Sequence, residues 1–166
     1  MAKTPAVTPK STGFWLMKSE PDAYSIDQLK KDDKTLWTGV RNYQARNFMM
    51  ASMQKGDQVL FYHSNAEPSA IVGLAEIART NLPDPTALDP KSDYYDAKSS
   101  ADHPIWFCAE VKYRAHAKKI LPLSELKLIP ELKTMLLLQK GSRLSITPVS
   151  AHDFKIVQRF AGLKGE

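Results

Sequence analysis

The sequence predicts an α+β domain built on a curved or barrel-like mixed sheet of five to seven strands, with short helices in the connections. Short apolar runs recur between breaks that contain proline or glycine, as the strands of a compact sheet do. Segments with helical spacing are all short and fall between those runs. With 166 residues and 43% apolar content, the chain is long enough for one domain with a buried core.

The first twelve residues differ in composition from the rest. They are mostly Ala, Thr, Pro, Lys and Ser, with a single Val. Such a segment has too little apolar surface to pack, so we expect 1–12 to be a disordered tail. The folded domain is then expected to occupy 13–166.

Apolar runs place the strands. The run Gln58–His63 alternates, with Val59, Phe61 and His63 on one face and Leu60 and Tyr62 on the other. A loop of about five residues separates it from the next run, which predicts a hairpin. The expected strands are 13–18, 35–37, 58–63, 70–78, 105–113 and 143–149.

Capping residues and helical spacing place the helices. Ser25 and Gln28 have capping-box spacing, Asn42 is a good N-cap, and Ser150 precedes the last helix, which Gly162 ends. Pro130 suits the first turn of a helix. The expected helices are 25–30, 41–53, 123–128, 130–138 and 150–160.

The stretch 81–104 contains four prolines and five aspartates, with Tyr94 and Tyr95 in the middle. Loops of this length are uncommon inside a compact domain and are usually functional or disordered. The two tyrosines favour an ordered strap on the surface, and we expect it to carry no catalytic residue.

The stretch Trp37–Met49 is the strongest candidate for a ligand site. Gly39 can take backbone angles closed to other residues, and the helix that follows presents backbone N–H groups. Arg41 and Arg46 add two charges, and Trp37 adds a flat π-face. This combination suits a base next to a phosphate. The alternative is that Trp37 is core and both arginines are solvated.

The net charge of +5 is concentrated in one segment. Eight basic residues lie between Lys112 and Arg143, against two acids. A local excess of this kind favours a polyanionic partner, nucleic acid before membrane, and we expect this face to contact a nucleic-acid backbone. The alternative is a lysine-rich solvated surface.

Signatures of catalysis and of metal binding are missing from the sequence. No Gly-rich phosphate loop or Gly-x-Ser-x-Gly elbow occurs, and Cys108 with four scattered histidines gives no zinc spacing. Cys108 lies in an apolar run and is expected to be buried and inert. No apolar run is long enough to span a membrane, and no secretory h-region is present.

Several long strings resemble the EVE domain family. They are Phe14-Trp-Leu-Met-Lys-Ser-Glu-Pro21, Trp37-Thr-Gly-Val-Arg-Asn-Tyr-Gln-Ala-Arg-Asn47, Phe61-Tyr-His-Ser64, Ile71-Val-Gly-Leu-Ala-Glu76, Asp84-Pro-Thr86, Asp89-Pro-Lys-Ser-Asp-Tyr-Tyr-Asp96 and Arg143-Leu-Ser-Ile-Thr-Pro-Val149. The resemblance covers nearly the whole domain. It implies a PUA-like pseudo-barrel, related to PUA domains and to YTH domains, which hold methylated adenine in an aromatic cage. It also implies recognition of a modified base in DNA or RNA.

The resemblance and the residues together give a candidate site. Trp37 is expected to stack on the base as a recognition residue and not as a core one, because it lies directly before the turn at Gly39. Arg41 and Asn42 are expected to contact the base or phosphate, Lys18 to Glu20 to form a polar lip, and Tyr62 to Ser64 the opposite wall. The full set is Trp15, Lys18, Ser19, Glu20, Trp37, Gly39, Val40, Arg41, Asn42, Tyr43, Arg46, Asn47, Tyr62, His63 and Ser64.

Ordinary structural roles remain open for some of these residues. Trp15, like Trp106, could be core packing, Glu20 with Pro21 a turn, and His63 a satisfied strand histidine.

Three classes of function follow. The favoured one is a non-catalytic module that binds a modified base, in nucleic acid or as a nucleoside-like small molecule. The alternatives are an enzyme acting on nucleic acid or a small molecule in the same pocket, for which a base with a shifted pKa would speak, and a protein-interaction module. We expect a monomer without cofactor or metal, nuclear if eukaryotic and cytoplasmic if bacterial.

Overall fold

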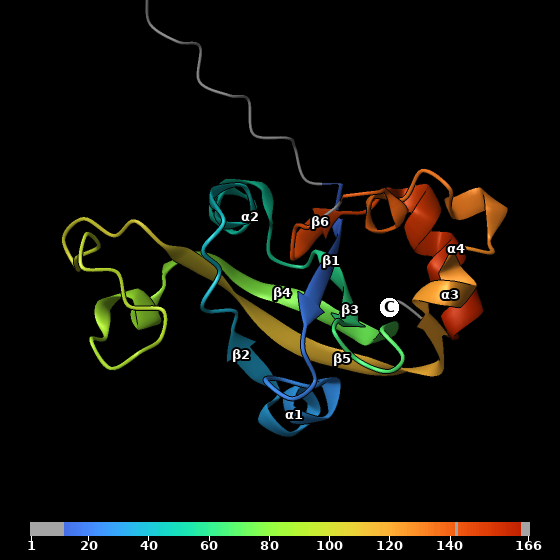
Figure 1. Ribbon diagram of the computed structural model, residues 1–166, viewed down its shortest axis with the longest axis horizontal. Coiled ribbons are helices and arrows are strands. Elements are labelled where there is room, and N and C mark those ends of the chain that lie inside the picture. Colours follow the sequence, from blue (N-terminus) through green and yellow to red (C-terminus); the bar gives the residue numbers. More distant parts are fainter. Residues whose placement is uncertain (1–11, 142, 164–166) are drawn as a thin grey trace, which may run out of the picture.

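A computed structural model describes residues 12–141 and 143–163. It has a six-stranded mixed sheet in the order β2-β5-β4-β3-β1-β6, with short helices around it (Figure 1). The α+β class is therefore confirmed, with a strand number inside the expected range. The strands are β1 (Phe14–Ser19), β2 (Lys34–Leu36), β3 (Gln58–His63), β4 (Ala70–Pro83), β5 (Phe107–Pro122) and β6 (Ile146–Pro148).

The centre of the sheet combines both kinds of pairing. β1 runs parallel to β3, whereas β3 with β4 and β4 with β5 are antiparallel. A parallel neighbour requires a long crossover. Here α1 (Ile26–Asp32), β2, α2 (Tyr43–Asn47) and a π-helical turn at Phe48–Ser52 supply it. This crossover brings the Trp37 stretch back beside the end of β1.

Two apolar cores lie on the two faces of the sheet. Val59 and Phe61 of β3 belong to the first core, and Leu60 and Tyr62 belong to the second, so the predicted alternation is confirmed. Residues of α1, α2 and the π-helical turn join the first core. Residues of α3 (Leu123–Leu126) and α4 (Ala151–Ala161) join the second.

The predicted caps are present. The Ser25 hydroxyl accepts a hydrogen bond from the Gln28 N–H (3.1 Å), and the Asn42 side chain accepts one from Ala45 N–H (3.0 Å). The Ser150 hydroxyl accepts from Asp153 N–H (3.1 Å). Each satisfies a backbone donor that a helix start leaves open. Gly162 ends α4 in the left-handed conformation, as predicted.

Some predicted boundaries differ from the structure. β4 and β5 extend to Pro83 and Pro122 because they pair along most of their length, through several register shifts. The predicted helix at 130–138 is wrong: two 3₁₀ turns, Pro130–Leu132 and Leu136–Leu138, replace it, since Met135 has extended backbone angles (φ −60°, ψ 131°). The last predicted strand shortens to Ile146–Pro148.

The loop between β4 and β5, residues 84–106, projects at one end of the molecule, while α3 and α4 lie at the other (Figure 1). It starts with a 3₁₀ turn at Pro85–Leu88. Its two ends are joined, because Asp84 N–H donates to the Trp106 carbonyl (2.9 Å). Trp106 Nε1 also donates to the Asp96 carboxylate (2.8 Å), which ties the middle of the loop to its end.

Two sequence-based expectations concern the ends of the chain and the membrane. The predicted tail lies outside the described residues, except Thr12, whose hydroxyl donates to the Val149 carbonyl (2.7 Å). Within the described ranges, no helix has the length and apolar character needed to cross a membrane.

Candidate functional site

A pocket of about 580 Å³ opens where the end of β1 meets β2 and the turn that follows it. Its volume is in the range of small-molecule sites. Three separate segments and two further residues form its walls: Lys18, Ser19, Glu20, Ala23, Tyr24, Thr35, Leu36, Trp37, Thr38, Gly39, Val40, Arg41, Asn42, Tyr94 and Ser145. The structure thus brings together the predicted lip and the first half of the Trp37 stretch.

Trp37 lines this pocket and is also a core residue. Its side chain is only 8% exposed and packs edge-on against Phe61, with ring centroids 5.6 Å apart. Its backbone N–H donates to the Ala109 carbonyl (2.8 Å), which continues the β2–β5 pairing. The expectation that Trp37 is not a core residue is therefore corrected. It follows directly on a strand that pairs with β5, and this pairing carries its ring inward.

Two tyrosines that were not among the predicted site residues, Tyr24 and Tyr94, also line the pocket. Tyr94 lies over Gly39, where an added Cβ would be 2.9 Å from the ring, and Gly39 has φ 82°. Any other residue at position 39 would therefore have a strained backbone conformation and would clash with the Tyr94 ring. Tyr24 donates its hydroxyl to Asp32 (2.8 Å), and burial together with this carboxylate raises the pKa of Tyr24 to about 12.

In the polar lip, Lys18 carries a charge without a partner among the described residues. Lys18 is half-buried, burial lowers the pKa of its ammonium group, and among the described residues that group has no hydrogen bond or ion pair. The Ser19 hydroxyl, by contrast, donates to the Tyr24 carbonyl (2.6 Å) and shapes the turn. Glu20 is exposed, and its carboxylate accepts a long hydrogen bond from Asn65 Nδ2 (3.5 Å). Lys18 and Glu20 are thus a donor and an acceptor at the pocket's rim.

The Asp84 carboxylate holds the turn at Gly39 in place. It is fully buried and accepts from Gly39 N–H (2.9 Å), Arg41 Nη1 (3.1 Å) and the Thr86 hydroxyl (2.6 Å). Burial alone would raise its pKa, but the hydrogen bonds from Thr86, Gly39 and Arg41 outweigh this and lower the pKa of Asp84. Arg41 also donates to the Tyr94 carbonyl (2.6 Å), so its guanidinium is committed within the protein.

The predicted site residues Tyr43, Arg46 and Asn47, in the second half of the Trp37 stretch, do not line the pocket. Arg46 lies over the Tyr43 ring at 4.7 Å and donates to Asn47 Oδ1 and to the Ile105 carbonyl. Tyr43 stacks on Trp106, with centroids 4.9 Å apart. None of these side chains lines the pocket. They hold α2 against the end of the 84–106 loop.

Four other predicted site residues also lie outside the pocket lining. Trp15 is 1% exposed in the first core and donates its Nε1 to Asp57 (2.9 Å), while Tyr62 is buried in the second core. His63 Nε2 accepts from Ile26 N–H at the start of α1 (3.1 Å). Ser64 pairs with Ser19 through the backbone (3.0 Å). His63 is thus a satisfied strand histidine that supports α1.

The basic segment Lys112–Arg143 is spread over the molecule. It begins in the middle of β5 and continues through α3 and the 3₁₀ turns. Two of its charges have partners: Arg114 pairs with Glu76 (3.3 Å) and Lys119 with Glu125 (3.7 Å). Its contact with a nucleic-acid backbone stays a prediction.

Chemically reactive groups are few around the pocket. Cys108 is buried, and burial raises the pKa of its thiol to about 12, so it stays protonated. His116 is hydrogen-bonded to the Tyr113 hydroxyl (2.7 Å) and to the Asp27 carboxylate (2.6 Å), outside the pocket lining. Within the described part of the chain, no cluster of three His, Cys, Asp or Glu side chains could hold a metal ion.

Comparison with known proteins places this chain in a family. The model of the EVE domain matches residues 13–160. The chain belongs to the EVE domain family. Thymocyte nuclear protein 1 from chicken is 39% identical over 162 residues, which is 86% of this chain and 66% of the relative. The human protein is 39% identical over 165 residues, 88% of this chain and 72% of that protein.

Solved EVE domain structures share the whole fold. A protein from Pseudomonas syringae superimposes with a TM-score of 0.84 at 44% identity, covering 89% of this chain and 99% of that one. Human thymocyte nuclear protein 1 in complex with DNA containing 5-methylcytosine gives a TM-score of 0.83 at 36% identity, covering 92% and 99%.

Replacing Asp84 by asparagine should destabilise this EVE domain. The amide keeps the volume but loses the charge that Arg41 faces, and we expect a cost of about 2–4 kcal/mol in the free energy of unfolding. Because the folded pKa of Asp84 is lowered, its contribution is present above about pH 4 and is lost in more acidic solution. Denaturant unfolding at pH 7 and pH 3 measures this, and a parent–variant difference that stays the same at both pH values would contradict it.

Protonation of His63 should weaken the fold. Burial lowers the pKa of His63, with Asp27 opposing and His116 adding to the shift. A neutral Nε2 is needed to accept from Ile26 N–H, so the contribution is present above about pH 6.5 and is lost as the pH falls toward the lower folded pKa. In His63→Gln, whose amide oxygen can still accept, unfolding should depend less on pH in this window. His103→Gln, at an exposed position of the 84–106 loop, should follow the parent.

Proposed function

We propose that this EVE domain is a non-catalytic module that binds a modified cytosine base in DNA, in the pocket beside Trp37. The observation that carries the proposal is the pocket itself, in which an aromatic wall and an unpaired ammonium group face the same space. The complex of human thymocyte nuclear protein 1 with DNA containing 5-methylcytosine supports the choice of base. The base would enter by leaving the duplex stack.

The pocket's groups match the edges of a cytosine. Trp37 and Tyr94 provide faces for stacking, which tolerates a methyl group on the ring. The Lys18 ammonium donates to the O2 and N3 acceptors, and the Glu20 carboxylate accepts from the exocyclic N4 amine. Arg41 acts indirectly, because its bonds to Asp84 and to the Tyr94 carbonyl hold both the turn and the tyrosine.

The backbone of the same DNA would contact basic side chains outside the pocket. The segment Lys112–Arg143 supplies part of this charge. The end of the segment at Lys112 pairs with Lys34 of β2, and the next two residues of β2 line the pocket. This end is therefore the part best placed to contact a bound nucleic acid.

Lys18→Met should weaken binding of a cytosine base, methylated or not, because both bases present the O2 and N3 acceptors. Methionine keeps the length and the packing of a half-buried lysine stem but loses the donor. A hydrogen bond from a charged group contributes about 1.5–3 kcal/mol, so affinity for a 5-methylcytosine duplex should fall roughly 10- to 150-fold. Fluorescence anisotropy with labelled duplexes measures this. Lys30→Met, on the exposed side of α1, is the matched control and should bind as the parent does.

Trp37→Phe separates stacking from folding better than alanine does. Alanine at this buried position should cost about 3–5 kcal/mol of stability, which would obscure a binding effect. Phenylalanine keeps a ring and part of the affinity. We expect 5-methyl-2′-deoxycytidine to quench the tryptophan fluorescence of the parent and to leave that of Trp37→Phe unchanged, since Trp15 and Trp106 lie outside the pocket. Equal quenching in both proteins would argue against a base stacked on Trp37.

A further inference from the structure

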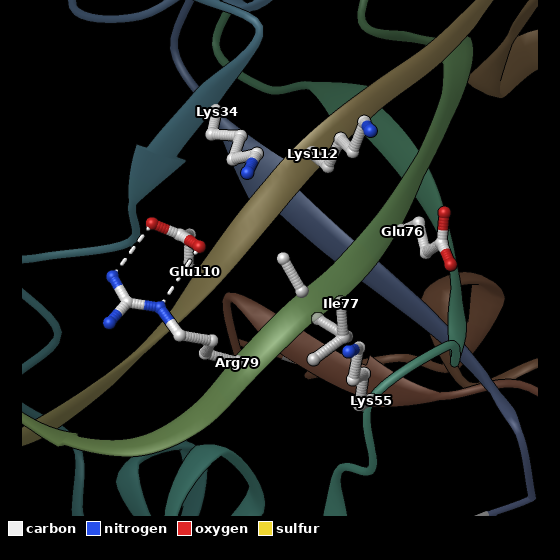
Figure 2. A pocket seen from close by; sticks show the side chains of 8 residues that line it. Lys34, Lys55, Glu76, Ile77, Arg79, Glu110 and Lys112 are labelled. Carbon is white, nitrogen blue, oxygen red and sulfur yellow. Dashed lines mark hydrogen bonds and ion pairs between the residues drawn. The ribbon is translucent and has the colours of Figure 1, made fainter.

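A second hollow, of about 530 Å³, lies on the surface formed by β2, β5 and β4 (Figure 2). We call it the lysine groove. Its side chains come from β2, β4, β5 and the turn before β3, and they are Lys34, Lys55, Glu76, Ile77, Ala78, Arg79, Glu110 and Lys112. Figure 2 shows the charged groups of three strands and of Lys55 around the same space, with Ile77 between them.

Both carboxylates of the groove already have arginine partners. Glu110 receives two hydrogen bonds from Arg79, at 3.0 and 2.9 Å, which the dashed lines in Figure 2 mark. Glu76 pairs with Arg114 at 3.3 Å. Among the described residues, the ammonium groups of the three lysines, Lys34, Lys55 and Lys112, have neither a hydrogen bond nor an ion pair. The groove therefore has spare positive charge and spare donors.

The register of the sheet places two of these lysines directly opposite each other. Lys34 of β2 faces Lys112 of β5, and Glu76 of β4 comes next in the same row. Like charges directly opposite each other across two strands destabilise the pair. An anion bound between the two lysines would relieve this repulsion.

We propose that the lysine groove binds the phosphodiester backbone of the DNA whose modified base enters the Trp37 pocket; this rests on the proposed function. Lys34 belongs to the groove, while Thr35 and Leu36, the next residues of β2, line the pocket. A strand crossing β2 therefore passes from one to the other. Lysines bind phosphate oxygens as point charges and read no base edge, so the groove adds affinity without sequence preference.

The test is the triple variant Lys34→Gln, Lys55→Gln and Lys112→Gln in the full chain. Binding is measured from low to high salt with a short duplex that contains 5-methylcytosine, with the same duplex unmodified, and with free 5-methyl-2′-deoxycytidine. We expect the salt dependence for both duplexes to flatten by about two to three units of slope, and duplex affinity at physiological salt to fall at least about tenfold. Affinity for the nucleoside should not change.

A matched variant controls for net charge. Lys118→Gln, Lys119→Gln and Lys127→Gln remove the same charge from the far half of β5 and from the residue after α3. This variant should keep a steeper salt dependence than the groove variant. Equal flattening in the two variants, or an unchanged slope in the groove variant, would overturn the proposal.

A charge reversal, Lys34→Glu, is a second test of the groove. It places a carboxylate opposite Lys112 but also removes the positive charge that Lys34 presents to Glu110, so its unfolding midpoint is measured beside the parent's to establish that the variant is folded. Its duplex affinity should fall further than that of Lys34→Gln. A variant that binds duplex as the parent does would count against the groove.

These measurements distinguish a failure of the lysine-groove proposal from a failure of the proposed function. If the parent binds modified and unmodified duplexes equally and does not bind the nucleoside, the proposed function fails, yet the slopes for the unmodified duplex still decide whether the groove holds the backbone. If the parent binds no duplex at any salt concentration, both proposals fail.

Discussion

The buried carboxylate of Asp84 is the interaction on which the arrangement of the site depends. It lies at the start of a long loop and accepts from four donors: Gly39 and Arg41 of the turn that ends the Trp37 strand, and the backbone N–H and hydroxyl of Thr86. Because Arg41 then reaches the Tyr94 carbonyl, one charge fixes both walls of the pocket. A buried charge is tolerated only when it is fully paired, and each of these partners therefore has a definite place.

The two cores explain where the ligand groups can come from. β1 and β3 are buried on both faces, so their middle side chains, such as Leu16 and Phe61, have no access to solvent. In this part of the sheet, the strand ends, the crossover and Tyr94 of the 84–106 loop line the pocket. Lys18, near the end of β1, is the clearest example, since it is half-buried and lines the pocket.

Features local in the sequence, such as capping residues and short motifs, predicted most helices and strands and some of the residues that line the pocket. The N-caps Ser25, Asn42 and Ser150 act within three residues, so the sequence alone located them. Lys18 and Trp37 were found through the motifs that contain them. The role of Asp84 in the pocket could not be predicted in this way, because Gly39 and Arg41 lie more than forty residues away and nothing local indicates their contact with it. Trp15 was assigned to the pocket because an aromatic near a motif does not reveal which face of the sheet it lies on.

The way in which the 84–106 loop is anchored bears on which of its residues can change during evolution. Backbone and side-chain hydrogen bonds close the loop at Asp84, Asp96 and Trp106. Tyr94 enters the pocket from this closed loop and contacts Gly39 through its ring alone. Substitution at position 94 can therefore alter the shape of the pocket while the bonds that close the loop stay intact. The selectivity of the pocket and the persistence of the fold can thus evolve as separate traits.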